Sequence, residues 1–298
     1  MAGKKEKNKK EEYSLKPEDF NTSRRPTWCI GCGNYAIWNS LKKVFTVLNL
    51  YPHQILVVYG IGCSGNGANF LKTYSFHSLH GRTLPIATGA KLASHKMNVL
   101  AVSGDGDGMG IGGNHFIHTC RRNINITNIL HDNRVYGLTT GQTSPTSKNG
   151  YRSKSTPSGV LEVPVNPIAL AISAGATYVA RGFSGDPVQL QEILKRAIKH
   201  KGFSFVDVLQ PCVTFNKVDT YKYYREKIYR LEEIKGYDKS DITQAFERSL
   251  EEDKIPTGIF YKTERQVYEE GLKQIERKPL TEHIISDVDI NKLLNRYY

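Results

Sequence analysis

Short apolar segments alternate with amphipathic segments between Trp28 and Cys212, and no other feature of the chain constrains its fold as strongly. Five apolar, β-branched runs are expected to be buried strands: Ile55–Tyr59, Val99–Val102, Ile126–Leu130, Tyr178–Ala180 and Phe203–Leu209. Five segments have helical patterns: Tyr35–Leu48, Ala87–His95, Asn114–Arg121, Pro167–Ser173 and Pro187–His200. This alternation predicts an α/β fold with a doubly wound, mostly parallel sheet. Ligands of such sheets bind at the carboxyl ends of the strands.

The two ends of the chain differ from this middle part. Residues 1–24 are expected to be a disordered basic tail, since Met1–Lys16 hold six lysines, three glutamates and almost no apolar residue. Residues 25–216 form the expected α/β domain. Residues 217–298 are charged and rich in tyrosine, and we expect them to form a peripheral, mainly helical extension. The segment Thr139–Pro164 lacks apolar periodicity and is expected to be a functional or mobile loop.

Charge and composition limit the class of protein. The net charge of +12 suits an acidic partner, which could be nucleic acid, an anionic membrane or an acidic protein, and charge alone does not choose among them. The apolar runs are too short to span a bilayer, and we expect no membrane partner. The lysine-rich N-terminus lacks the apolar core of a signal peptide. These observations predict a cytoplasmic protein.

A glycine-rich segment that contains Asp105 follows the expected strand at residues 98–103. Glycines let a ligand approach the backbone closely, and the N-terminus of the following helix favours an anion. Asn133 ends the next strand, so Asp105 and Asn133 can bind one Mg²⁺ together with the Val135 carbonyl. The plain alternative is a glycine-rich turn with a capping aspartate. A calcium loop fits poorly because no bidentate glutamate closes the segment, and a dinucleotide fingerprint fits poorly because its glycine spacing differs.

The pairing of Gly-Asp-Gly with a later Asn resembles the thiamine-diphosphate motif. This resemblance implies that Asp105, Asn133 and the Val135 carbonyl hold Mg²⁺. It also implies that the diphosphate is lined by Gly106, Asp107, Gly137 and Leu138.

Four of the five cysteines lie in short motifs that contain glycine or proline: Cys29 and Cys32 in a Cys-x-x-Cys pair, Cys63 in Gly-Cys-Ser-Gly, and Cys212 after Pro211 at the end of the last expected strand. A disulfide framework is not expected in a cytosolic chain. Four thiolates can bind zinc or a [4Fe–4S] cluster, and the spacing does not choose between them. A redox centre beside a thiamine cofactor makes chemical sense and favours the cluster. Cys120 lies inside an expected helix, so we expect it to be a packed apolar residue.

Several motifs together identify a family. They are Trp28-Cys29-Ile30-Gly31-Cys32-Gly33-Asn34, Gly60-Ile61-Gly62-Cys63-Ser64-Gly65, His77-Ser78-Leu79-His80-Gly81-Arg82-Thr83-Leu84-Pro85, Gly104-Asp105-Gly106-Asp107 and Tyr136-Gly137-Leu138-Thr139-Thr140-Gly141-Gln142-Thr143-Ser144-Pro145-Thr146. Their order resembles that in the β subunits of archaeal and bacterial 2-oxoacid:ferredoxin oxidoreductases. The resemblance is strong from Trp28 to Cys212 and looser in the C-terminal extension.

The resemblance implies a set of site residues. One [4Fe–4S] cluster would be ligated by Cys29, Cys32, Cys63 and Cys212. The thiamine cofactor would be contacted by Ile61, Gly62, Cys63, Ser64 and His80. His80 and Arg82 of the His-Gly-Arg motif are the candidate catalytic residues.

Two positions depart from many relatives, particularly from 2-oxoglutarate enzymes. Those relatives carry lysine where this chain has Asn66 and Thr140. A cation there would pair with a substrate carboxylate or with a coenzyme A phosphate. The change argues against a strict requirement for a second, distal carboxylate and favours pyruvate or another monocarboxylic 2-oxoacid, with 2-oxoglutarate still open.

The family implies oxidative decarboxylation of a 2-oxoacid to acyl-CoA and carbon dioxide, with coenzyme A as co-substrate. The cofactor's thiazolium acts as electron sink, and the electrons pass through the cluster to an acidic ferredoxin. Thiamine activation needs a carboxylate at the aminopyrimidine ring, and the chain has no glutamate between Asn21 and Leu161. We therefore expect an α subunit to supply that half of the site and its glutamate, and the isolated chain to be inactive.

Two other functions remain open. One is a thiamine-dependent decarboxylase or transferase without redox chemistry, against which the four cysteines argue. The other is a nucleic-acid-binding module built on zinc. It would need basic and aromatic residues interleaved on one face, and we see no such stripe outside the tail, so no nucleic acid partner is expected.

Overall fold

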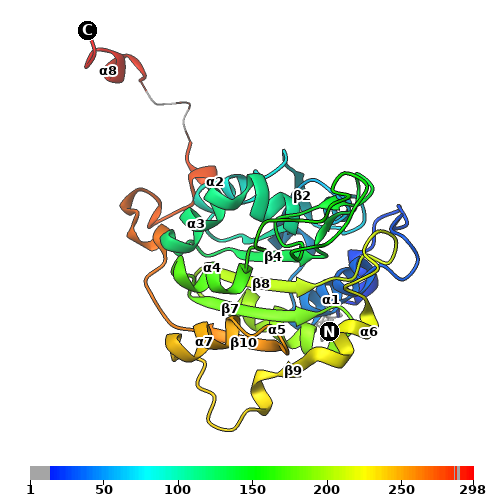
Figure 1. Cartoon of the computed structure of the whole chain (residues 1–298). Helices are drawn as coiled ribbons and strands as arrows, with labels where there is room; N and C mark the ends of the chain where they lie inside the picture. Colours follow the sequence, from blue (N-terminus) through cyan, green and yellow to red (C-terminus); the bar gives the residue numbers. More distant parts are fainter. Residues whose placement is uncertain (1–13, 285, 287–288) are drawn as a thin grey trace, which may run out of the picture.

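A computed structural model describes residues 14–284, 286 and 289–298 of the chain. In this part, eight strands form one sheet in the order β2-β1-β3-β4-β8-β7-β10-β9 (Figure 1). All neighbours are parallel except β10 and β7, which are antiparallel. The predicted α/β fold with a mostly parallel sheet is confirmed.

The strands of the sheet are β1 (Ile55–Tyr59), β2 (Tyr74–His77), β3 (Asn98–Gly104), β4 (Thr127–Asp132), β7 (Tyr178–Phe183), β8 (Ser204–Leu209), β9 (Ile228–Arg230) and β10 (Ile255–Lys262). A separate hairpin pairs β5 (Val135–Tyr136) with β6 (Gln142–Thr143). The α-helices are α1 (Asn34–Val47), α2 (Thr83–Ala93), α3 (Gly113–Arg122), α4 (Pro167–Ser173), α5 (Pro187–Lys199), α6 (Tyr221–Lys227), α7 (Ile242–Ser249) and α8 (Asn291–Leu294).

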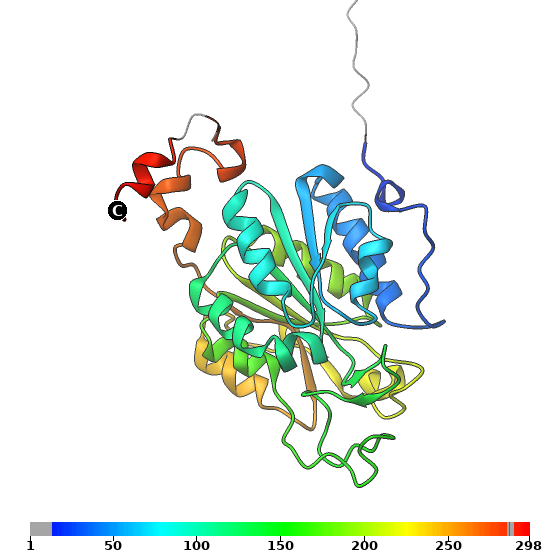
Figure 2. The ribbon, with the colours of Figure 1, turned by 90° about the horizontal axis from the view of Figure 1, so that it is seen from above.

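Helices cover both faces of the sheet, as Figure 2 shows. Helices α1 and α5 pack on one face around Ile129, Val206 and Val208, and helices α2, α3, α4 and α7 pack on the other around Leu130 and Phe205. Strands β4, β7 and β8 are buried at every residue. Their nearly continuous apolar sequences follow from this, because a strand covered on both faces has no solvent side.

Proline and a capping side chain fix the starts of two helices. Helices α4 and α5 both begin with proline, where the missing N–H costs nothing. Asn166 accepts a hydrogen bond from the Ala169 N–H, and Asp186 accepts one from the Gln189 N–H. These signals explain why both helix starts were predicted correctly from the sequence.

The expected helical extension over residues 217–298 is only partly correct. It contains α6, α7 and α8, but β10 lies inside the main sheet beside β7, and β9 pairs with β10. Phe260 of β10 is fully buried in the core. The segment therefore belongs to the body of the fold, because β10 hydrogen-bonds on both sides.

The expected disordered tail over residues 1–24 ends too late. Residues 1–13 lie outside the described part of the chain. Residues Pro17–Phe20 form a 3₁₀ helix, and Asn21 pairs with Leu71. Phe20 is fully buried and contacts Phe45 of α1. The segment is ordered because this aromatic ring anchors it to the core.

The segment Thr139–Pro164 has little regular structure besides β6, and Figure 2 shows it in green beyond the end of the sheet. Within the described residues, no helix combines the length and the apolar character needed to cross a bilayer.

Candidate functional site

A cavity opens where the parallel strands β1, β3 and β4 end, and its open volume is about 490 Å³. Twelve of the predicted site residues line it: Ile61, Gly62, Cys63, Ser64, His80, Asp105, Gly106, Asp107, Asn133, Val135, Gly137 and Leu138. Gly104, His131, Tyr136 and Thr139 complete the lining. Arg82, Asn66, Thr140, Cys29, Cys32 and Cys212 lie outside this lining.

Asp105 follows β3 directly and begins a π-helical turn over residues Gly106–Ile111. Its buried carboxylate accepts hydrogen bonds on Oδ2 from the Ser144 hydroxyl at 2.5 Å and from the Thr146 hydroxyl at 2.6 Å. Burial raises the pKa of Asp105, and these two hydroxyl donors act in the opposite direction. The long loop after β6 therefore orients the carboxylate that the sequence assigns to magnesium.

Asn133 and Val135 form a turn after β4. Arg134 between them has a left-handed φ of 60°, and the Val135 N–H donates to Asn133 Oδ1 at 3.0 Å. Both residues line the same cavity as Asp105. A carboxylate, an amide oxygen and a backbone carbonyl are the oxygen ligands that Mg²⁺ prefers, so the donor set fits this ion.

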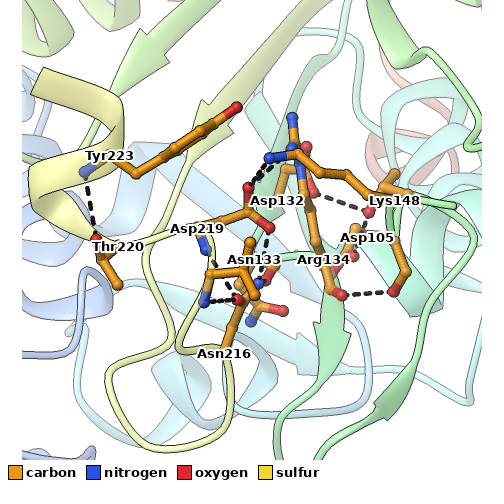
Figure 3. Close-up of polar contacts among 12 residues, drawn as sticks. Asp105, Asp132, Asn133, Arg134, Lys148, Asn216, Asp219, Thr220 and Tyr223 are labelled. Carbon is orange, nitrogen blue, oxygen red and sulfur yellow. Dashed lines mark hydrogen bonds and ion pairs between the residues drawn. The ribbon is translucent and has the colours of Figure 1, made fainter. Parts of the chain in front are cut away.

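A network of polar side chains lies behind this turn (Figure 3). The buried carboxylate of Asp219 is bound by Arg134 at 3.0 Å and by Lys148 at 2.6 Å. Asn216 donates to Asp219 Oδ2 at 3.1 Å and to the Asn133 carbonyl at 3.0 Å. The network therefore fixes the backbone of the predicted magnesium ligands.

Asp107 lines the cavity, but its buried carboxylate is occupied by protein donors. It accepts hydrogen bonds from the N–H groups of Ile61 and Gly81, and from the Thr83 hydroxyl at 3.3 Å. His80 Nδ1 lies 3.5 Å from Asp107 Oδ1. Asp107 thus holds the loops after β1 and β2 against the glycine-rich segment.

Two further predicted residues differ in their access to the cavity. His80 reaches it, with its ring centroid 6.1 Å from that of Tyr136. Arg82 is exposed, and its guanidinium lies 3.5 Å from the Gly81 carbonyl. The structure thus brings His80, but not Arg82, to the cavity wall.

Of the four predicted cluster cysteines, Cys63 lines the cavity and Cys212 lies close to the cavity residue Gly137. A Cβ atom added to Gly137 would lie 3.6 Å from the sulfurs of both Cys63 and Cys212. Burial, together with the charges of Cys212, Cys63 and Cys29, raises the pKa of Cys32 to about 12. Burial likewise raises the pKa of Cys63 to about 11.

Cys120 differs from these four residues, since it is fully buried among apolar side chains as predicted. In the described part of the chain, no three His, Cys, Asp or Glu side chains are grouped as a site for one metal ion.

Asn66 and Thr140 lie near the site in sequence but not on the cavity wall. Asn66 is half-buried in the 3₁₀ turn Gly65–Asn69, and Thr140 is exposed with a φ of 78°.

Several contributing residues were not predicted. His131 lines the cavity, with Nδ1 2.8 Å from Asn34 Oδ1 and a buried Nε2 that has no protein partner. Burial lowers the pKa of His131 to about 3, so this imidazole is neutral. Ser144 and Thr146 could have been found from their hydroxyls in the loop after β6. Gln210 hydrogen-bonds to Asn133 and to the Cys32 sulfur, and no pattern in the sequence indicated this.

Two family models and several known proteins are similar to this chain. The family model "Thiamine pyrophosphate enzyme, C-terminal TPP binding domain" matches residues 58–208, and the model of the C-terminal part of the pyruvate ferredoxin oxidoreductase β subunit matches residues 212–277. A 2-oxoacid:ferredoxin oxidoreductase β subunit from Aeropyrum pernix is 43% identical over 268 residues, which are 86% of this chain and 87% of the relative. One from a Sulfolobus species is 46% identical over 259 residues, 83% of this chain and 85% of the relative.

A solved structure is also similar. It is described as "2-oxoglutarate:ferredoxin oxidoreductase from Magnetococcus marinus with 2-oxoglutarate, coenzyme A and succinyl-CoA bound". It shares 38% sequence identity and a TM-score of 0.87 with this chain, and the match covers 95% of this chain and 96% of the other.

Proposed function

We infer the function of this chain from the family to which it belongs, the β subunits of the 2-oxoacid:ferredoxin oxidoreductases. It is accordingly a subunit of an oxidoreductase that acts on 2-oxoacids and binds thiamine diphosphate. The enzyme converts the 2-oxoacid to acyl-CoA and carbon dioxide and passes electrons to ferredoxin. The metal, the cluster, the site residues and the substrate stand as our proposals.

The chain holds the diphosphate half of thiamine diphosphate through Mg²⁺. Asp105, Asn133 and the Val135 carbonyl are the magnesium ligands, and Gly106 and Gly137 give the diphosphate room. A side chain at Gly106 would meet the Tyr136 ring at 2.2 Å, so only glycine fits this wall. Asp107 organises the loops around the diphosphate, because its carboxylate is already bonded to backbone N–H groups.

One [4Fe–4S] cluster is held by Cys29, Cys32, Cys63 and Cys212. The observation that carries this proposal is the position of Cys63, which lines the same cavity as Asp105 and Asn133. An electron acceptor ligated by Cys63 borders directly on the cofactor, and a short path favours electron transfer. The cofactor itself supplies the electron sink for decarboxylation, while Ile61, Gly62, Ser64 and His80 surround it.

The site is completed by a partner subunit. The names of the relatives imply an α subunit, and we assign to it the aminopyrimidine half-site and its glutamate. Exposed apolar side chains in the motifs of the site are available to such a partner: Ile30 is 98% exposed, Leu79 76% exposed, and Leu138 lies half-exposed on the cavity wall. An acidic ferredoxin accepts the electrons, which suits the net charge of +12.

The substrate is a 2-oxoacid without a required distal carboxylate. Asn66 and Thr140 supply no cation, so pyruvate is accepted along with 2-oxoglutarate. His80 is the chain's own candidate for proton transfer, and exposed Arg82 beside it is a candidate to contact substrate or coenzyme A.

Purification of the chain with its partner subunit tests the proposal. We expect four iron and four labile sulfide atoms per chain, bound thiamine diphosphate, and ferredoxin reduction that requires a 2-oxoacid and coenzyme A. The isolated chain is expected to bind the cofactor weakly and to be inactive. A zinc-containing complex without iron, or decarboxylation by the isolated chain, would contradict the proposal.

A further inference from the structure

Gln210 lies between the two proposed cofactor sites. It follows β8 directly, and only 1% of the residue is exposed. Its amide oxygen accepts a hydrogen bond from Asn133 Nδ2 at 3.1 Å, and its amide nitrogen donates to the Cys32 sulfur at 3.2 Å. One side chain therefore touches a proposed magnesium ligand and a proposed cluster ligand.

Backbone groups fix the direction of this hydrogen-bond chain at both ends. The Val135 N–H is only a donor, so the oxygen of the Asn133 amide must face it and the nitrogen must face Gln210. The Pro211 carbonyl is only an acceptor, and it receives the second hydrogen of Gln210 Nε2 at 3.2 Å. The Gln210 oxygen therefore faces Asn133, and its nitrogen faces Cys32.

The Cys32 sulfur accepts the last hydrogen bond of this series, from Gln210 Nε2. The Asn34 N–H also bonds to this sulfur, so two N–H donors face it. Hydrogen bonds to a cluster's sulfur atoms raise its reduction potential, because they stabilise the added negative charge.

We propose that Gln210 is a positioning residue that serves both cofactor sites: it holds the Asn133 amide with its oxygen toward Val135 and the metal, and it raises the reduction potential of the cluster through Cys32. The inference rests on the proposed function. Glutamine is suited to the place because its amide combines an acceptor for Asn133 with a donor for the thiolate. Glutamate keeps the acceptor but sets a carboxylate against the sulfur.

Two substitutions of Gln210 separate the two roles in the purified complex. Gln210→Glu retains the bond to Asn133 and loses the bond to Cys32, whereas Gln210→Met loses both bonds at nearly constant volume. Gln54→Glu is the matched control. Gln54 is exposed and precedes the amino end of β1, whereas Gln210 follows the carboxyl end of β8. The readouts are the cluster potential, from a redox titration followed by electron paramagnetic resonance, and the affinity for thiamine diphosphate with Mg²⁺, from calorimetry.

We expect the potential to shift to more negative values in both Gln210 variants, with the larger shift in Gln210→Glu. The affinity for thiamine diphosphate should stay within about twofold of wild type in Gln210→Glu and fall at least about 10-fold in Gln210→Met, as for the loss of a residue that orients a metal ligand. If a variant retains no cluster, the affinity measurement on the folded complex still tests the Asn133 role.

Unchanged potentials in both Gln210 variants would overturn the role at Cys32. An unchanged affinity in Gln210→Met would overturn the role at Asn133. Absence of iron from the wild-type complex would instead contradict the proposed function, so the two failures are distinguishable.

Discussion

Thr146 illustrates at the level of one residue how the magnesium site is prepared. Its hydroxyl lies 2.6 Å from Asp105 Oδ2 and 2.9 Å from Asp132 Oδ1. A hydroxyl donates only one hydrogen, so one of these contacts needs a proton on the carboxyl group. Burial, followed by the charges of Asp207 and Asp105, raises the pKa of Asp132 well above its ordinary value. Burial raises the pKa of Asp105 as well, but the Ser144 and Thr146 hydroxyls counteract that rise, so Asp132 is the better candidate of the two carboxyl groups to hold the proton.

The substitution Thr146→Val tests this arrangement. It preserves the shape of the side chain and removes the hydroxyl that orients Asp105. We expect the affinity for Mg²⁺ with thiamine diphosphate to fall about 10- to 100-fold, the usual effect of losing a group that orients a metal ligand. Titration calorimetry on the complex provides the measurement. Thr119→Val is the control, since the Thr119 hydroxyl donates to the His115 carbonyl within α3; equal affinities in the two variants would refute the role of Thr146.

The cysteines of the metal-free chain should show unusual reactivity. Burial raises the pKa of Cys32 to about 12 and that of Cys63 to about 11, so the folded chain favours the neutral thiols. The stabilisation of the folded state that comes from keeping these two thiols neutral is complete below the ordinary thiol pKa. It is lost as the pH rises through about 11 to 12. Alkylation rates of these two residues, resolved by mass spectrometry, should still increase above pH 10. In the chain unfolded by urea, the alkylation rates should level off nearer pH 9. A plateau near pH 9 in the folded chain would contradict the expectation.

Asp219 joins three separate elements in the same region. It binds Arg134 in the turn after β4 and Lys148 in the long loop, and it lies in the segment that follows Cys212 (Figure 3). Removal of its carboxylate leaves two cations without their partner, and Arg134 is mostly buried. We expect Asp219→Ala to lower the free energy of unfolding by about 3 kcal/mol, the lower end of the range for breaking a buried ion pair.

Chemical denaturation of the isolated chain measures this loss. Glu282→Ala is the control, because the ion pair of Glu282 with Lys96 is exposed and its loss should change stability by less than about 0.5 kcal/mol. Similar losses in the two variants would show that Asp219 does not join these elements.

The elements that the sequence predicted are those with strong local signals. β1 and α4 were placed with their observed bounds, because an apolar β-branched run marks one and an initial proline with a capping asparagine marks the other. β10 was missed because Pro256 and Gly258 both weaken a strand signal, although its remaining residues pack in the core. β2 was missed because all four of its residues are exposed at the edge of the sheet.

The residues of the site likewise divide into those with a local sequence signal and those without one. Asp105, Asn133 and Cys63 stand in recognisable motifs, and the structure brings all three to one cavity. Gln210 and Asp219 reach the site through partners far away in the chain, such as Cys32 for Gln210 and Arg134 for Asp219. No local pattern could indicate these contacts.

The charge of the whole molecule should govern its encounter with ferredoxin. A net charge of +12 attracts an acidic protein over a distance that salt shortens. We expect the second-order rate of ferredoxin reduction by the complex to fall about 10-fold or more between about 0.05 and 0.5 M salt. Stopped-flow spectroscopy measures the rate, and an uncharged electron acceptor serves as control. A rate that does not change with salt would show that another surface governs the encounter.

The position of β10 has a consequence during synthesis of the protein. β7 lies between β8 and β10, so its outer edge stays unpaired while the ribosome adds the residues up to Lys262. At about 5–20 residues per second this interval lasts several seconds, during which the nascent chain presents an open strand edge. A chaperone that shields such edges would therefore raise the yield of this chain most strongly when translation is slow.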